Sequence, residues 1–384
     1  MKYSEITLKE KENELLELVF HFSKNIIPDI DNVLKNGRIQ RKEAPYIDLI
    51  AESFFSIQSY CILSKEGLIS SSFAIFRIIL EQVATAFLLS KNAVAKESFI
   101  NIKMRQNEYW LANKEDRKTI LNKICSENNI PKNEMKLKKY FDYGWGKSIG
   151  CNTMNLESIC KAAGIGYIYK MVDVVINGFS HGSRSIFQFQ RNNVDKELIR
   201  TIRQYTFRLF FFLVSAMVTE FGKDCLSELN QKSYSMAKAL FWDIQSRLDE
   251  QFICGTMDKG DIESIIVDKY IEQAYNVLCF LDKAMDERER YLLSQAFIRT
   301  IRLVVVLSTV KKWNLNVALI KDFNLTNLFN SFNLWDKIEL KSRFFELPVL
   351  LKMIDSANDD WGLVGSEIDY AFTNSIVSLL EGLK

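Results

Sequence analysis

The stretch 70-SSSFAIFRIILEQVATAFLLSK-91 is apolar on nearly every side. A helix with this character is buried, because no face of it prefers water. The spacing of apolar residues predicts a second helix over residues 46–65, with Gly67 breaking the chain between the two, and a polar helix over 93–112. We therefore expect residues 70–91 to form the central helix of a bundle.

Apolar residues recur at helical spacing along almost the whole chain. Glycine and proline number only 15 and 4 among 384 residues, which disfavours strands and tight turns. The predicted fold class is all-α. The other elements we expect are a helix over 8–27 that Pro28 ends, shorter helices from 112 to Tyr140, a loop over 141–154, and helices over 165–176 and 195–221.

A chain of this length accommodates two domains or one large helical domain. We place a boundary near Asp224, which gives a first domain over 1–224 and a second helical domain over 225–384. The second domain is expected to contain about six helices, among them 258–284, 287–311 and 335–355.

The bulk properties favour a cytoplasmic protein without membrane contact. A net charge of +2 points to no particular partner, and the seven cysteines form no CxxC pair, which is typical of reduced thiols in the cytosol. Residues 1–15 are charged and do not resemble a signal peptide. The most apolar run, 209-LFFFLVSAMV-218, is far shorter than the roughly 20 residues of a membrane span.

The glycine-rich segment 144-GWGKSIG-150 does not fit a nucleotide loop. A P-loop needs glycine at position 141, where this chain has Phe141, and a dinucleotide fingerprint needs its third glycine one residue earlier than Gly150. No β-branched strand precedes the segment. We expect no nucleotide loop here.

Metal and hydrolase sites are also disfavoured. The chain has no HExxH or GxSxG motif, and His21, in an apolar helix, is distant in sequence from the only other histidine, His181. We expect no metal and no cofactor. Catalysis by Cys151 or Cys160 together with His181 stays open, although nothing in the spacing supports it.

Arg77 and Glu81 are the only charged residues of 67–90. Four residues apart, they share one face of the predicted central helix. Burying either charge alone costs several kcal/mol, so each needs the other or a third polar group. They form either a structural ion pair or part of a polar binding pocket.

His181, in 176-INGFSHGSRS-185, is the natural third member of such a pocket. Apart from cysteine thiols, it is the only side chain in this part of the chain that readily exchanges protons near neutral pH. The alternative is a histidine at a helix end that hydrogen-bonds a carbonyl. Basic residues favour an anionic ligand: residues 101–147 carry eleven Lys and Arg against six Asp and Glu, and Arg184, Arg191, Arg200 and Arg203 follow the histidine.

The order of short motifs resembles family 5677 of the bacterial domains of unknown function, over residues 45–220. These motifs are 57-IQSYCILSKEG-67, Arg77 with Glu81, Trp145-Gly146 with Ser148, Tyr167 with Tyr169, and His181-Gly182-Ser183. The family resembles, more distantly, the HEPN superfamily of helical bundles. That resemblance implies a HEPN-like bundle for the first domain, a homodimer, and a metal-independent ribonuclease of toxin–antitoxin or phage-defence systems.

The HEPN signature contains an arginine, then an asparagine four residues before the histidine. Asn177 matches the asparagine, but Ile176 occupies the position of the arginine. The arginine would stabilise phosphate charge while the histidine handles a proton, so Arg77 or Arg184 has to replace it.

Two functions remain open at this point. The first is a HEPN-like effector of bacterial anti-phage defence or a toxin–antitoxin system that acts on RNA or nucleotide phosphates. The second is a non-catalytic interaction or sensor subunit that binds a protein from a neighbouring gene or a small molecule. For the first, we expect His181, Arg77 and Glu81 as catalytic residues, and as binding residues Arg184, Asn177, Ser183, Trp145, Tyr167, Arg200 and Arg203.

Overall fold

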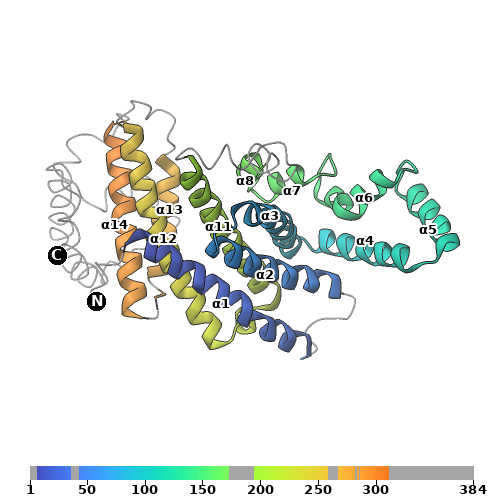
Figure 1. Cartoon of the computed structure of the whole chain (residues 1–384), viewed down its shortest axis with the longest axis horizontal. Coiled ribbons are helices and arrows are strands. Elements are labelled where there is room, and N and C mark those ends of the chain that lie inside the picture. Colours follow the sequence, from blue (N-terminus) through green and yellow to red (C-terminus); the bar gives the residue numbers. More distant parts are fainter. Residues whose placement is uncertain are drawn as a thin grey trace. The chain divides into compact units, whose positions relative to one another are not determined.

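The computed structural model describes residues 7–35, 43–172, 194–257 and 267–310, apart from residues 282 and 285. Every regular element in these residues is helical (Figure 1), which confirms the all-α class. The predicted helix over 335–355 lies outside the described residues.

The described chain forms two compact units. Unit 2 contains residues 16–234, and unit 1 contains the described residues up to Leu15 together with those from Ser235 onward. The division falls inside two long helices, α1 (Leu8–Lys35) and α12 (Glu228–Met257). The predicted division into domains at Asp224, and the separate role of the second domain, stay predictions.

Helix α3 (Ile69–Lys91) is the centre of unit 2. It packs against α2 (Ala44–Lys65), α4 (Ala93–Leu111), α7 (Leu156–Ala162) and α11 (Val194–Phe221). Phe76, Ile79, Leu80 and Val83 are fully buried. The predictions for residues 46–65, 70–91, 93–112 and 195–221 as helices are therefore confirmed to within a few residues.

Among the described helices, α3 alone is long and apolar enough to span a membrane, but 56% of its most apolar stretch is buried in the protein. This is the expected property of a core helix, as the sequence predicted.

Asparagine side chains begin four helices of unit 2. Asn92, Asn113, Asn133 and Asn155 accept backbone N–H groups at the start of α4, α5 (Lys114–Glu127), α6 (Glu134–Tyr143) and α7, respectively. Such caps satisfy donors that a helix end leaves unpaired. They fix the turns through which α4, α5 and α6 extend as an arm from the α3 core (Figure 1).

The predicted loop over 141–154 is wrong in its first half. Residues up to Tyr143 continue α6, and a 3₁₀ helix, η3 (Gly144–Ile149), follows directly. Gly146 has a packing role, because a Cβ atom there would lie 2.9 Å from the side chain of Ile159. Gly150 ends η3 with φ +80°, a conformation that favours glycine.

The prediction that Pro28 ends the first helix is also wrong, since α1 continues to Lys35. Proline removes one backbone hydrogen bond, but packing compensates for the loss. The apolar face continues through buried Ile26 and Ile30. Asp29 also accepts hydrogen bonds from the backbone of Ser227 at 2.9 Å and from the side chain of Asn230 at 2.7 Å.

Thr7 and Glu10 form a capping box at the start of α1. The Thr7 backbone donates to the Glu10 carboxylate at 2.7 Å, and the Glu10 backbone donates to the Thr7 hydroxyl at 3.3 Å. Unit 1 continues with the later part of α12, α13 (Val267–Leu281) and α14 (Glu287–Val310), of which α13 and α14 pack against each other. The predicted helix over 287–311 is confirmed, and α13 covers part of the one predicted over 258–284.

Candidate functional site

Glu81 lies half-buried on α3 and receives a hydrogen bond from the hydroxyl of Tyr143, the last residue of α6. Three other charged groups act on its carboxylate: Arg77 from the same helix, Lys103 from α4 and Asp142 from α6. We call these five residues the Glu81 cluster. It joins the consecutive helices α3 and α4 to α6, which begins more than 20 residues after α4 ends.

The pKa of Glu81 is raised above its ordinary value, chiefly because burial disfavours the charged form. The hydrogen bond from Tyr143 opposes this effect, Asp142 adds to it, and Arg77 and Lys103 reduce it. The nearby cations therefore do not compensate fully for the lost hydration. An ionised Glu81 costs folding free energy that a neutral side chain would not cost.

Burial also shifts the cluster's other titratable groups. It lowers the pKa of Lys103, against the attraction of Asp142 and Glu81, and raises the pKa of Tyr143, which the adjacent Glu81 carboxylate raises further. The ammonium of Lys103 donates to Gln106 at 2.9 Å. Groups with perturbed pKa values gather at functional sites, where proton transfer or anion binding uses them.

The two cysteines near this cluster are poor nucleophiles. Burial, followed by the Glu81 charge, raises the pKa of Cys160 to about 12, and burial raises the pKa of Cys151. Because the thiolate is the reactive form, both thiols are weakly reactive near neutral pH. The Cys–His alternative is therefore disfavoured.

Trp145 contacts the backbone of Asp142, a member of the cluster, and is fully buried. Its indole N–H donates to the carbonyl of Asp142 at 3.1 Å, and its ring meets Phe99 edge to face at 6.2 Å. It therefore supports the segment that carries Asp142 and Tyr143. The Trp145 side chain therefore offers no exposed surface for the binding role that the sequence predicted.

The other predicted binding residues of the described chain lie on α8 (Gly166–Met171) and α11. Tyr167 is partly exposed and accepts a hydrogen bond from Arg208 at 3.4 Å. Arg203 donates to the Ser64 hydroxyl at 3.1 Å, and Arg200 is half-buried on the same helix. The predicted binding roles of these three residues stay predictions.

The predicted residues Asn177, His181, Ser183 and Arg184 lie outside the described residues. Whether His181 completes the Glu81 cluster therefore stays a prediction. Of the predicted catalytic residues, the structure brings together Arg77 and Glu81.

Sequence reasoning missed Lys103, Asp142 and Tyr143. Asp142 and Tyr143 were assigned to a loop, and Lys103 to the polar helix that follows the core helix. One signal was present: only Gly144 separates Asp142 and Tyr143 from Trp145, a large aromatic side chain that a solvent-exposed loop would seldom need.

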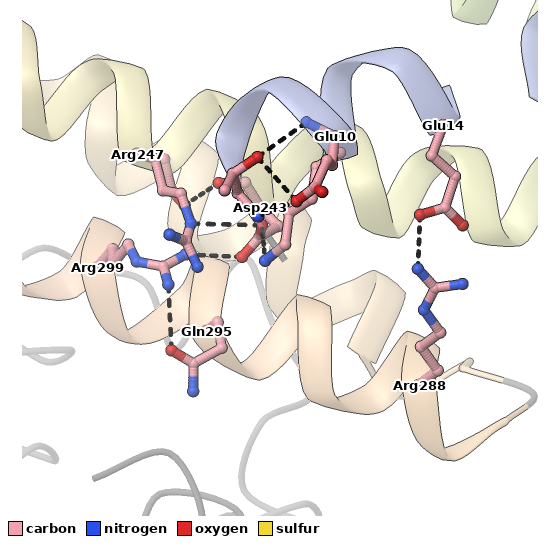
Figure 2. A network of polar contacts seen from close by, with 10 residues as sticks. Glu10, Glu14, Asp243, Arg247, Arg288, Gln295 and Arg299 are labelled. Atoms are coloured by element: carbon pink, nitrogen blue, oxygen red, sulfur yellow. Dashed lines mark hydrogen bonds and ion pairs between the residues drawn. The ribbon is translucent and has the colours of Figure 1, made fainter. Parts of the chain in front are cut away.

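A second polar cluster lies in unit 1, around Asp243 of α12 (Figure 2). The carboxylate of Asp243 is fully buried and contacts Lys11 at 3.0 Å, Arg299 at 2.7 Å and Arg247 at 3.6 Å. Arg299 also donates to Gln295 at 3.2 Å. We call Asp243, Lys11, Arg247 and Arg299 the Asp243 cluster.

The pKa of Asp243 shows how well the three cations compensate the burial of its carboxylate, whereas burial lowers the pKa of Lys11 against the attraction of Asp243. Burial alone would raise the pKa of Asp243, but the charges of Arg299, Lys11 and Arg247 lower it to about 2. The ionised carboxylate is thus strongly stabilised in the folded protein. These contacts join the start of α1 to α12 and α14, which is a structural role.

The described residues contain no group of three or more His, Cys, Asp or Glu side chains arranged to hold a metal ion. No curated protein and no solved structure matches this chain significantly. Residues 43–197, which include the whole Glu81 cluster, match the model of the family of unknown function DUF5677, in agreement with the resemblance read from the sequence motifs.

Proposed function

We propose that this protein is a HEPN-like effector of bacterial anti-phage defence or of a toxin–antitoxin system, and that it acts on RNA or nucleotide phosphates. The observation that carries the proposal is the Glu81 cluster: two cations and a carboxylate with a raised pKa, held together within the segment that matches DUF5677. Clusters of this kind combine anion binding with proton transfer.

The cluster offers a replacement for the arginine that the HEPN signature has where this chain has Ile176. Arg77 and Lys103 both carry positive charge beside Glu81. In the proposed mechanism they hold the phosphate, His181 transfers the proton, and Glu81 orients Arg77 or His181. Lys103 is the addition that the structure contributes to this scheme.

Two measurements test the proposal: growth inhibition on expression, and cleavage of RNA by the purified protein. We expect His181→Ala to abolish both, and Arg77→Ala and Lys103→Ala to reduce cleavage by about 100-fold, the typical effect of removing one transition-state charge contact. Lys24→Ala, an exposed residue of α1, serves as the matched control. Equal activity of the parent and His181→Ala would contradict the proposal.

The second candidate is a non-catalytic interaction or sensor subunit. Ile176 in place of the signature arginine favours it. It predicts a stable complex with the product of a neighbouring gene, or a small molecule that copurifies and is detected by native mass spectrometry. Purification of the protein alone with nuclease activity would exclude it.

A further inference from the structure

The arm formed by α4, α5 and α6 (Ala93–Tyr143) has a strong excess of positive charge. Residues 93–143 contain eleven Lys and Arg but seven Asp and Glu. Arg105 of α4 pairs with Glu127 of α5 at 2.7 Å, which connects these two helices and leaves the net charge of the arm unchanged. Tyr140 of α6 hydrogen-bonds the same Arg105, so the three helices form one connected structure.

The excess charge is displayed to solvent by lysines of α5, α6 and the turn between them. All are exposed, and no ion pair involves any of them in the part of the chain that the structure describes: Lys114, Lys118, Lys123, Lys132, Lys136, Lys138 and Lys139. The last three lie on α6, which buries Leu137, Tyr140 and Phe141 on its other side. Three lysines are therefore held close together on one short, well-packed helix.

The arm also exposes an aromatic ring in a fixed position. Trp110, at the end of α4, is 52% exposed. Arg117 donates to the carbonyls of Trp110 at 2.7 Å and Ala112 at 2.9 Å, and its guanidinium lies 5.9 Å from the Trp110 ring. Tyr109 meets Trp110 at 5.2 Å and Phe141 of α6 at 5.9 Å. A chain of aromatic contacts thus connects the exposed ring with the lysine-bearing helix.

We propose that this arm binds single-stranded nucleic acid, with lysines of α5 and α6 on the phosphates and a base stacked on Trp110. A charged groove or face beside an exposed aromatic ring is the usual way of holding unpaired bases. The choice of ligand rests on the proposed function, but the residues are separate from the Glu81 cluster. The inference narrows the ligand from any nucleotide phosphate to a single-stranded polymer.

A lipid surface is the less suitable partner. Three exposed carboxylates, those of Glu108, Glu115 and Asp116, lie close in sequence to Trp110. An anionic membrane would have to cover this whole tip and would be repelled. A single strand can place one base on Trp110 and its phosphates along α6.

The test measures fluorescence anisotropy of labelled single-stranded RNA and DNA oligomers with the full chain carrying His181→Ala, which prevents cleavage of the probe in the proposed mechanism. The arm variant is Lys136→Glu/Lys138→Glu/Lys139→Glu. Its control, Lys24→Glu/Lys35→Glu/Lys223→Glu, makes the same change in net charge at exposed lysines of unit 2 outside the arm. Trp110→Ala is compared with Phe55→Ala, an aromatic residue of similar exposure on α2.

We expect the arm variant to lose binding and to flatten the slope of log Kd against log salt by about 2, from roughly 0.7 for each phosphate contact. Trp110→Ala should weaken binding by about tenfold, the effect of one lost stacking contact. Both controls should bind like the parent. Equal preference for RNA and DNA identifies a general single-strand surface, and tighter RNA binding identifies the substrate class.

Equal affinities of the arm variant and its control would overturn the proposal. So would binding of the parent to phosphatidylserine vesicles but to neither oligomer. A separate measurement of RNA cleavage by the unmutated protein distinguishes the two proposals. Binding at the arm without any cleavage would contradict the proposed enzymatic function. Cleavage that is unchanged in the arm variant would contradict the proposed role of the arm.

Discussion

The Asp243 cluster of unit 1 and the Glu81 cluster of unit 2 both hold a carboxylate beside cations, but their pKa values move in opposite directions. Asp243 has three cations within direct contact, and its pKa falls to about 2. Burial raises the pKa of Glu81, because the Tyr143 hydroxyl, Arg77 and Lys103 do not compensate it and Asp142 adds to it. The Asp243 cluster stabilises its ionised carboxylate, whereas the ionised carboxylate of Glu81 costs folding free energy.

This difference separates structure from function. A buried charge that its surroundings match contributes to the fold, and losing a partner from it is destabilising. A charge that its surroundings fail to match persists for another reason, and residues that reduce stability are characteristic of active and binding sites. We therefore propose that Asp243 serves the fold and that Glu81 serves the function.

The largest effect is expected from Asp243→Asn. The substitution leaves Lys11, Arg247 and Arg299 without their shared counter-charge, which should lower the free energy of unfolding by about 3 kcal/mol. Urea denaturation followed by circular dichroism measures it. Glu228→Gln, which removes a fully exposed ion pair with Lys232, is the control and should have no measurable effect. Similar losses of stability in Asp243→Asn and Glu228→Gln would contradict the structural role of the Asp243 cluster.

Acid should reduce the difference in the free energy of unfolding between the parent and Asp243→Asn. Because the folded pKa of Asp243 lies near 2 and its ordinary value is 3.8, its contribution is complete above pH 4 and is lost as the pH falls toward 2. The stability advantage of the parent over Asp243→Asn should narrow by about 2 kcal/mol over this range. Denaturation series at several acidic pH values measure it. A constant gap would show that the carboxylate is not held ionised.

The effect of Glu81→Gln on the free energy of unfolding should be opposite in sign to that of Asp243→Asn. A raised carboxyl pKa means that the folded protein holds the proton more tightly, so the parent is most stable below the ordinary value of 4.5 and loses stability as the pH rises. The glutamine variant should therefore gain stability relative to the parent as the pH rises from acidic to neutral. Glu97→Gln, at an exposed position of α4, is the control. A loss of stability in Glu81→Gln at neutral pH would show that the Glu81 carboxylate stabilises the fold, as Asp243 does.

The smallest effect is expected from Tyr143→Phe. Its hydroxyl lowers the pKa of Glu81, so its removal should raise that pKa further. Carbon-13 NMR of the glutamate carboxyls measures the change directly. Stability at neutral pH should fall by about 1 kcal/mol, as for a typical hydrogen bond. An unchanged Glu81 pKa would contradict the hydrogen bond between the two residues.

The fold could be predicted where a local pattern decides it. Residues 69–91 form the central helix because they are apolar all round, and Asn92 and Gly67 bound it through local conformation. Pro28 misled the prediction, because its local effect is outweighed by contacts of Asp29 with residues about 200 positions away. Such contacts leave no trace in the local pattern.

The candidate site, like the fold, could be predicted only where a local pattern marked its residues. Arg77 and Glu81 stood out because charges are rare in an apolar helix. Lys103 and Asp142 did not, because single charges in polar segments are ordinary. Only the packing of α4 on α3, and of α6 on α4, brings both near Glu81. Asp243 and Lys11 were missed for the same reason, since 232 positions separate them.

The most direct test of the assignment of Glu81 combines two measurements on Glu81→Gln at neutral pH: the free energy of unfolding, and the rate of RNA cleavage by the folded protein. We predict that the variant is at least as stable as the parent and has lost most of its cleavage activity. A variant that is less stable and cleaves RNA at the parent's rate would contradict the account.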